Sequence, residues 1–140
     1  MYILIVGAGR VGSAVAKRAL EAGHQVSVLD SDPLSHERLD KDQSTSWEDA
    51  GGEFTVGAAL EIDGLVAAGI EKADVFMAAT RGDNTNLVIA QLAQRRFNVP
   101  RVVVRVADPA RASWYAEQGL ITICPTQHAI DQAERVVLTR

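Results

Sequence analysis

Residues 1–32, MYILIVGAGRVGSAVAKRALEAGHQVSVLDSD, decide which fold the rest of the chain can adopt. An apolar run leads into a Gly-x-Gly-x-x-Gly turn made by Gly7, Gly9 and Gly12, and a helix-forming segment of small residues follows. A second apolar run ends in Asp30, which lies 23 positions after Gly7 (30 minus 7). A strand before the turn, a helix after it and an acid about 20 residues further on are the context that a dinucleotide-binding unit requires.

Each part of this motif has an expected role. Gly7 permits the tight turn out of the strand, Gly9 lets the backbone approach a pyrophosphate, and Gly12 lets the helix lie close to the strand. The helix N-terminus offers free N–H groups and the positive end of its dipole to phosphates. Asp30 can accept hydrogen bonds from ribose hydroxyls and would repel a 2′-phosphate, which favours NAD(H) over NADP(H). The alternative is a glycine turn and a surface aspartate that bind nothing.

Composition indicates one mildly acidic domain covering residues 1–140. Of the 140 residues, 47% are hydrophobic, which suffices for a single well-buried core. A formal net charge of −4 argues against nucleic-acid binding, which normally requires a basic stripe. No apolar run is long enough to span a membrane, and Gly7 interrupts the N-terminal run too early for a signal peptide. The single cysteine, Cys124, excludes an internal disulfide, so a cytoplasmic location is the simplest expectation.

Strand and helix signals alternate along the whole chain. Such alternation implies parallel strands joined by right-handed crossovers. The sequence therefore predicts an α/β, Rossmann-like, doubly wound fold with a mainly parallel sheet and a single domain. The expected strands are residues 2–6, 26–29, 53–56, 75–79, 101–106 and 120–124, and the expected helices lie near 11–23, 33–41, 62–70 and 88–97, from 109 onward, and at 126–137.

Two polar residues end expected strands, and the carboxyl ends of parallel strands form the ligand-binding edge of such a sheet. Thr80 ends the fourth strand and could contact a ribose or a phosphate, or be a turn residue only. Arg105 ends the fifth strand and could neutralise phosphate charge, directly or across a subunit boundary. Its alternative role is a salt bridge to Asp108 or to a neighbouring helix. Asp83 and Asn84 are expected as helix caps and not as ligand contacts.

The sequence lacks a recognisable pairing of a catalytic acid and base. A dehydrogenase also needs a second region that holds its substrate against the nicotinamide, and the expected fold uses nearly the whole chain. His24 and His36 are expected on the surface, and His128 is expected as a cap or interface residue of the last helix. We therefore expect a binding domain and not an enzyme. The alternative is the cofactor domain of an NAD-dependent oxidoreductase without its substrate domain.

Two later segments resemble a known family. They are LVAAGIEKADVFMAATRGDNTNLVIAQLA at residues 65–93 and VVVRVADPARASWYAEQGLITICP at residues 102–125. Both resemble the nucleotide-binding domain of potassium-transport regulators, the RCK or KTN domain, also called the TrkA N-terminal domain. The resemblance covers almost the whole chain, from Tyr2 to about Val137. Its more specific parts are Ala73-Asp74, Ala79-Thr80, Asn84 and Asn86-Leu87, followed by Arg105 with Asp108-Pro109.

The resemblance implies a Rossmann-like domain that assembles as dimers, often into rings of eight copies. It implies binding of NAD(H), or of an adenine nucleotide such as ATP or ADP, and regulation of a membrane potassium transporter or channel. The domain would then lie in the cytoplasm, held at the inner face of the membrane by its partner and without inserting into the bilayer. Many relatives carry a smaller C-terminal domain, so we expect either a single-domain member or part of a longer protein.

Carried onto this sequence, the family pattern departs at one place. The family usually has Gly-Asp after the third strand, with the aspartate near the adenine, whereas this chain has Gly57-Ala58. No catalytic or metal-binding residue is expected. The candidate cofactor-binding residues are Gly7, Ala8, Gly9, Arg10, Val11, Gly12, Asp30, Ser31, Ala79, Thr80 and Arg105.

The last expected helix carries an apolar stripe at Ile130, Ala133 and Val137, although the sheet should already be covered. A surplus stripe of this kind usually marks an interface. It could instead pack on the edge of the sheet in a monomer. We expect a homodimer or a larger homo-oligomer.

Overall fold

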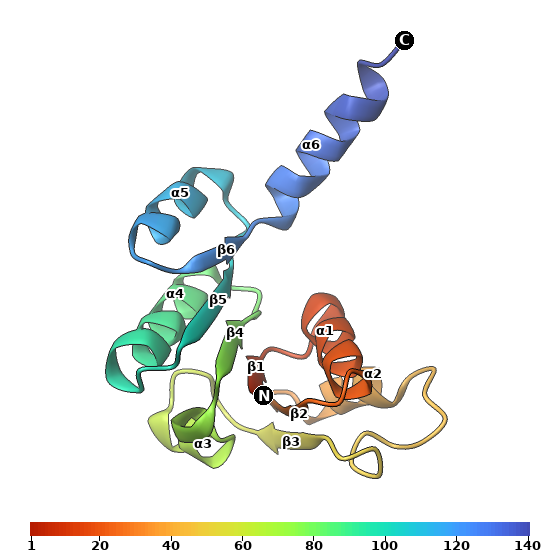
Figure 1. Ribbon diagram of the computed structural model, residues 1–140, viewed down its shortest axis with the longest axis vertical. Helices are drawn as coiled ribbons and strands as arrows, with labels where there is room; N and C mark the ends of the chain where they lie inside the picture. The colour runs from red at the N-terminus through yellow and green to blue at the C-terminus, as the bar shows by residue number, and fades with distance from the viewer.

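The computed structural model describes all residues 1–140 and has one six-stranded sheet in the order β3-β2-β1-β4-β5-β6, with every strand pair parallel (Figure 1). The chain winds outward in one direction from β1 to β3 and in the other from β4 to β6. This is the strand order of doubly wound dinucleotide-binding folds, so the predicted fold class is confirmed. The strands are β1 Tyr2–Val6, β2 Gln25–Asp30, β3 Glu53–Val56, β4 Val75–Ala78, β5 Arg101–Arg105 and β6 Ile121–Ile123.

Helices connect the strands as the sequence predicted. The expected helix at residues 33–41 consists of a single 3₁₀ turn, Pro33–Ser35, followed by α2. The expected helix at 88–97 is the second half of α4, which continues into a wider π-type turn at Leu92–Arg96. The helices are α1 Arg10–Glu21, α2 His36–Asp40, α3 Ile62–Ala67, α4 Asp83–Gln91, α5 Pro109–Glu117 and α6 Pro125–Val137.

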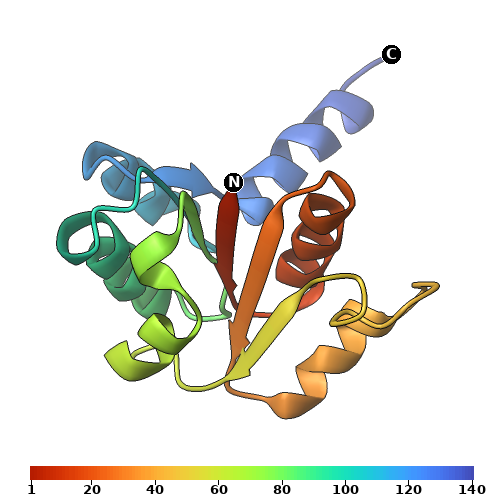
Figure 2. The ribbon, with the colours of Figure 1, turned by 60° about the horizontal axis from the view of Figure 1, so that its bottom comes forward.

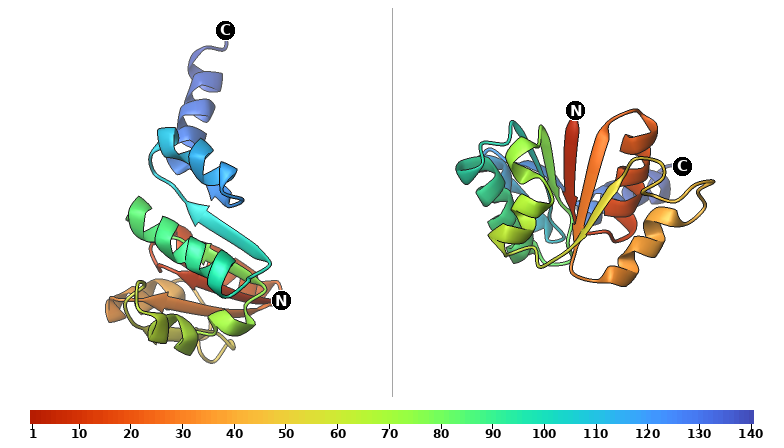
Figure 3. Two further views of the ribbon diagram at one scale, coloured as in Figure 1. Left: turned by 90° about the vertical axis from the view of Figure 1, so that its left-hand side faces the viewer. Right: turned by 90° about the horizontal axis from the view of Figure 1, so that it is seen from below.

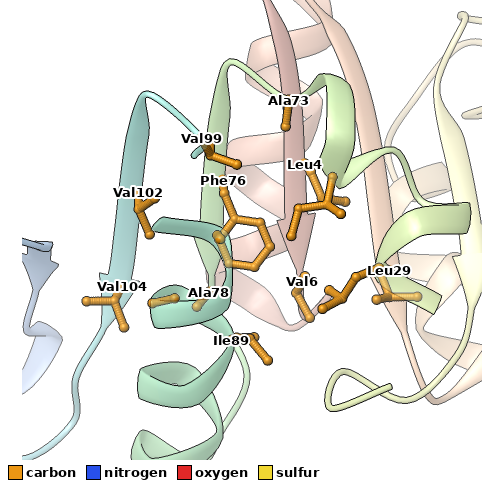
Figure 4. Close-up of a cluster of buried hydrophobic side chains, with 14 of the residues drawn as sticks. Leu4, Val6, Leu29, Ala73, Phe76, Ala78, Ile89, Val99, Val102 and Val104 are labelled. Atoms are coloured by element: carbon orange, nitrogen blue, oxygen red, sulfur yellow. The ribbon is translucent and has the colours of Figure 1, made fainter. Parts of the chain in front are cut away.

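The central strand β1 is buried on both of its faces, and helices lie on either side of the sheet (Figure 2). Alternate residues of a strand point to opposite faces. Ile3 and Ile5 therefore belong to the core shared with α1 and α2, and Leu4 and Val6 to the core under α3, α4 and α5. The second core is the larger and surrounds Phe76, which is fully buried (Figure 4).

The segment between α2 and β3 has no helix or strand, but Trp47 anchors it to the rest of the domain. Only 2% of Trp47 is exposed, its Nε1 donates to the Glu53 carbonyl oxygen at 3.0 Å, and its backbone N–H donates to Asp40 Oδ1 at 2.8 Å. His36 lies beneath this segment, with Nδ1 3.2 Å from Asp40 Oδ2 and Nε2 against Glu48 Oε1. His36 thus lies at the surface as expected, with 27% of its side chain exposed, but both of its ring nitrogens face carboxylates.

The last helix, α6, projects away from the rest of the molecule (Figures 1 and 3). Every residue from Thr126 to Arg140 is exposed, including Ile130, Val136 and Val137. The alternative in which α6 packs on the sheet edge within one chain is therefore not what the structure shows. None of the helices is long and apolar enough to cross a bilayer.

Candidate nucleotide-binding site

The turn between β1 and α1 depends on two of its three glycines for its shape. Gly7 has φ +105°, and a Cβ there would lie 2.6 Å from the Ala79 carbonyl oxygen. A Cβ on Gly12 would lie 1.9 Å from the Gly7 carbonyl oxygen, which is deep inside van der Waals contact. A side chain at either position would push apart the strand, the turn and the helix, so the protein itself requires both glycines.

The third glycine, Gly9, is different. Its backbone is extended at φ −74° and ψ −163°, a conformation open to any residue, and a Cβ there would have no heavy atom within 4 Å. Gly9 also lines a cleft at the carboxyl edge of the sheet. Nothing in the protein requires a glycine at this position, and its lack of a side chain keeps the cleft open beside the first N–H groups of α1.

Asp30 ends β2 and joins it to the glycine turn. Its Oδ2 accepts a hydrogen bond from the Ala8 N–H at 2.7 Å, and its Oδ1 accepts one from the Asp32 N–H at 2.8 Å. Each carboxylate oxygen has two lone pairs, so both can still accept a further hydrogen bond from a ligand hydroxyl. Asp30 therefore both shapes the glycine turn and presents an acceptor to the cleft.

Across the cleft, the ends of β4 and β5 are joined by Asn86 of α4. Asn86 is completely buried, and its Nδ2 donates to the carbonyl oxygens of Thr80 and Arg105, each at 3.0 Å. Its Oδ1 accepts from the Thr80 N–H at 3.0 Å and from Thr80 Oγ1 at 2.6 Å. Thr80 and Arg105 are thus held side by side at the ligand edge of the sheet.

Arg105 makes no ion pair, so the alternative of a salt bridge to Asp108 is wrong. Asp108 instead lies 3.8 Å from Nε of Arg111. Arg105 Nη1 donates to the Thr80 carbonyl oxygen at 3.4 Å, and its buried Nε has no partner. The guanidinium therefore retains an unused donor at the end of β5.

Asp83 and Asn84 are not the helix caps that the sequence predicted, because Gly82 occupies the N-cap position of α4. The Asp83 carboxylate accepts hydrogen bonds from the N–H groups of Ala107 and Asp108, at 2.8 Å and 3.1 Å. Asn84 Oδ1 accepts from Arg111 Nη1 at 2.7 Å. Asp83 therefore fixes the loop between β5 and α5, and Asn84 contacts α5 itself.

The cleft that these elements form has a volume of about 760 Å³, within the range of small-molecule sites. Four arginines and two aspartates line it, a formal charge of +2 (4 minus 2) in a chain of net charge −4. None of the three histidines lines it. Such a concentration of positive charge in a recess favours anionic ligands. The arginines are Arg10, Arg38, Arg81 and Arg105, and the aspartates are Asp30 and Asp32.

The structure brings nine of the eleven candidate residues into this one cleft. The other two, Ala8 and Gly12, are buried behind it, where Ala8 donates to Asp30 and Gly12 packs on Gly7. The nine residues that line the cleft are Gly7, Gly9, Arg10, Val11, Asp30, Ser31, Ala79, Thr80 and Arg105.

Sequence reasoning missed two cationic residues of the cleft. Arg81 follows Thr80 directly, so the rule that ligands lie at strand ends could have found it. Arg38 lies on α2, and its Nη1 donates to the Ala8 carbonyl oxygen at 3.3 Å. No spacing rule predicts that contact, because it depends on how α2 folds back towards the glycine turn.

A family model for the TrkA-N domain matches residues 3–125 of the chain. The Trk system potassium uptake protein TrkA of Streptomyces coelicolor is 40% identical over 138 residues, which cover 99% of this chain. The chain spans 59% of the length of that relative.

Solved structures share the fold at low sequence identity. The TrkA-N domain of the inner membrane protein ybaL from Escherichia coli has a TM-score of 0.80 at 16% identity, covering 99% of this chain and 96% of that one. GsuK bound to ADP has a TM-score of 0.77 at 19% identity, covering 96% and 33%. The GsuK channel bound to NAD has a TM-score of 0.67 at 14% identity, covering 89% and 21%. At these identities the likeness shows the fold.

The glycine geometry predicts a large loss of stability for one glycine-to-alanine substitution and a small loss for another. Gly12→Ala should lower the free energy of unfolding by roughly 2–3 kcal/mol or more, because the methyl group overlaps the Gly7 carbonyl oxygen and the tight packing cannot absorb it. Gly9→Ala should cost less than about 1 kcal/mol, the effect of a poorer N-cap. Urea unfolding followed by circular dichroism measures both values, and equal losses would contradict the assignment of Gly9 to ligand approach.

Proposed function

The chain belongs to the TrkA-N domain family, and from this premise we propose that it is the nucleotide-sensing domain of a cytoplasmic subunit that regulates potassium uptake. Its ligand is NAD(H), with ATP or ADP as the alternative. Its partner is a membrane potassium transporter or channel, which it contacts from the cytoplasmic side. The observation that carries the proposal is the arginine-lined cleft between Asp30, the glycine turn and Thr80.

The order of groups along the cleft matches the order of groups in a dinucleotide. Asp30 on β2 accepts from the hydroxyls of the adenosine ribose, and the open position at Gly9 admits the pyrophosphate to the N-terminus of α1. The second nucleoside then extends over β4 and β5, towards Thr80 and Arg105. The arginines offset the charge of the two phosphates.

Small and aliphatic residues line part of the adenine end of this site. Leu29, Gly57 and Ala59 line the cleft there, and Ala58 stands where the family usually has an acid. Adenine would therefore be held by contact with these small and aliphatic groups, without a carboxylate partner. The site then relies on Asp30 and the glycine turn for most of its polar recognition.

The domain acts as a sensor and not as an enzyme. A sensor requires only that the ligand binds two conformations with different affinities. A coupling of about 1–3 kcal/mol between ligand and partner, typical of allosteric proteins, shifts such an equilibrium several-fold to a hundredfold. The side chains of the cleft can bind, orient and neutralise a ligand, which is what this role demands.

Besides its ligand site, a sensor of this kind needs a surface through which it contacts another chain. The helix α6 exposes an apolar stripe that includes Ile130, Ala133 and Val137, and β6 exposes Ile121 and Ile123. A second copy of the chain is the proposed occupant, because a two-fold contact covers the same unpaired apolar surface on both copies at once.

The first expected outcome concerns ligand choice. The unmutated chain should bind NADH at least tenfold more tightly than NADPH, because a 2′-phosphate would face the Asp30 carboxylate. Asp30→Ala should weaken NADH binding at least tenfold, since hydrogen bonds to a charged group are worth about 1.5–3 kcal/mol each. Isothermal titration measures both effects, with Asp49→Ala as the control for loss of a remote acid. Equal binding of NADH and NADPH would contradict the role of Asp30.

The second expected outcome concerns assembly. Light scattering at micromolar concentration should give a mass of at least twice 15.0 kDa. Ala133→Glu, in the apolar stripe of α6, should shift the mass to that of the monomer, because it places a charge in the contact. Gln132→Glu adds the same charge outside the stripe and should leave the mass unchanged. A monomer in the unmutated chain, with and without nucleotide, would rule out this contact.

The decisive experiment for the function measures potassium flux. The protein reconstituted with its membrane transporter should show flux that changes with nucleotide. Gly9→Val should abolish that response by blocking approach of the pyrophosphate, while its urea midpoint stays near that of the unmutated protein. Flux that ignores nucleotide, or hydride transfer from NADH to a small substrate by the purified chain, would overturn the proposal.

A further inference from the structure

The amide of Asn86 can adopt only one orientation. Two of its neighbours are the carbonyl oxygens of Thr80 and Arg105, which can only accept, so Nδ2 must face them. A third neighbour is the N–H of Thr80, which can only donate, so Oδ1 must face it. Since Asn86 is completely buried, no solvent offers it other partners.

This orientation determines where the proton of the Thr80 hydroxyl goes. Asn86 Oδ1 lies 2.6 Å from Thr80 Oγ1, and an amide oxygen can only accept. The other possible acceptor of this proton, the Gly82 carbonyl oxygen, is farther away at 3.4 Å. Two acceptor oxygens 2.6 Å apart need a proton between them, so the hydroxyl donates its single proton to Asn86. One of its two lone pairs faces the N–H of Gly82 at 3.3 Å, and the other remains free. Towards the cleft, Thr80 can only accept.

A phosphate cannot use such a group. The oxygens of an ionised phosphate are themselves acceptors, so Thr80 Oγ1 has no proton to give them. The neighbouring Arg105 lines the same part of the cleft, and its guanidinium group can only donate. The edge formed by β4 and β5 thus offers one acceptor and one donor side by side. The ligand groups that match both are neutral groups that donate and accept, namely a hydroxyl or a carboxamide.

We propose that Thr80 is a specificity-determining residue, held as a hydrogen-bond acceptor by Asn86, that recognises a neutral donor on the second nucleoside of a dinucleotide. The donor is a hydroxyl of the second ribose or the carboxamide of nicotinamide. This end of the cleft then separates NAD(H) from ADP and ATP, which carry only phosphates beyond the glycine turn. The proposal rests on the proposed function in one respect, namely that a nucleotide occupies the glycine turn.

The test compares NAD and ADP on Thr80→Val and Thr80→Ser by isothermal titration. Valine has the shape of threonine without the hydroxyl, and Asn86 Oδ1 keeps the Thr80 N–H. Urea unfolding of each variant checks that the fold is preserved, because the new methyl group lies close to the buried Asn86 Oδ1. Thr80→Val should weaken NAD binding about fivefold, the effect of one neutral hydrogen bond, and change ADP binding less than about twofold. Thr80→Ser keeps the acceptor and should leave the ratio of the two dissociation constants unchanged.

A further ligand identifies the donor. Nicotinate adenine dinucleotide has both riboses but lacks the amide N–H₂ group. If it binds the unmutated chain as tightly as NAD does and loses affinity equally in Thr80→Val, the ribose hydroxyl is the donor. If it binds more weakly than NAD and is insensitive to Thr80→Val, the carboxamide is the donor.

Three results would overturn the inference. If Thr80→Val weakens the binding of ADP and of NAD equally, the hydroxyl contacts a phosphate or supports the fold. If Thr80→Val leaves NAD binding unchanged, the hydroxyl has no part in recognition. Binding of ADP without NAD by the unmutated chain would overturn the inference and leave the sensing function in place. If neither nucleotide binds the unmutated chain, the proposed function fails together with the inference.

Discussion

The close approach of α1 to β1 at Gly12 is the constraint on which the rest of the cleft depends. Any side chain there would overlap the carbonyl oxygen of Gly7, so only glycine lets the helix begin where it does. That starting point places the free N–H groups of α1 at the carboxyl edge of the sheet. It also brings the Ala8 N–H within 2.7 Å of Asp30 Oδ2, which joins the ends of β1 and β2 into one wall.

The opposite wall depends on α4. Asn86 makes four hydrogen bonds to the ends of β4 and β5, and Asp83 on the same turn of the helix holds the loop that follows β5. The ends of β4 and β5 cannot separate without leaving buried polar groups unpaired, at a cost of about 1–3 kcal/mol for each group. The cleft therefore has two stiff walls from the two halves of the fold, and a ligand that spans it contacts both.

The end of β5, which forms part of this opposite wall of the cleft, is also close to the start of α6. Arg105 pairs in register with Ile123 of β6, and Cys124, the next residue, is the N-cap of α6. The unpartnered helix thus starts at Pro125, two residues beyond the strand position that faces a cleft arginine. A change in the position of Arg105 would act at the foot of α6, which follows directly on β6 (Figure 1). The cleft and the exposed apolar stripe are separate surfaces that share this strand pair.

The sequence by itself determined the parallel α/β fold, the structural roles of Gly7 and Gly12 and the position of Asp30, because periodicity, turn geometry and motif spacing are local properties. It also indicated Thr80 and Arg105, since strand ends in such a sheet face one edge. Only the tertiary structure decided the rest. From the sequence, Asp83 is expected as a helix cap, and Asn86 is only part of the family resemblance, without an expected structural role. In the structure, both side chains bind backbone groups at the ends of β4 and β5. Arg38 lines the cleft because α2 folds back towards the glycine turn. These roles depend on contacts between segments distant in the chain, which no local pattern records.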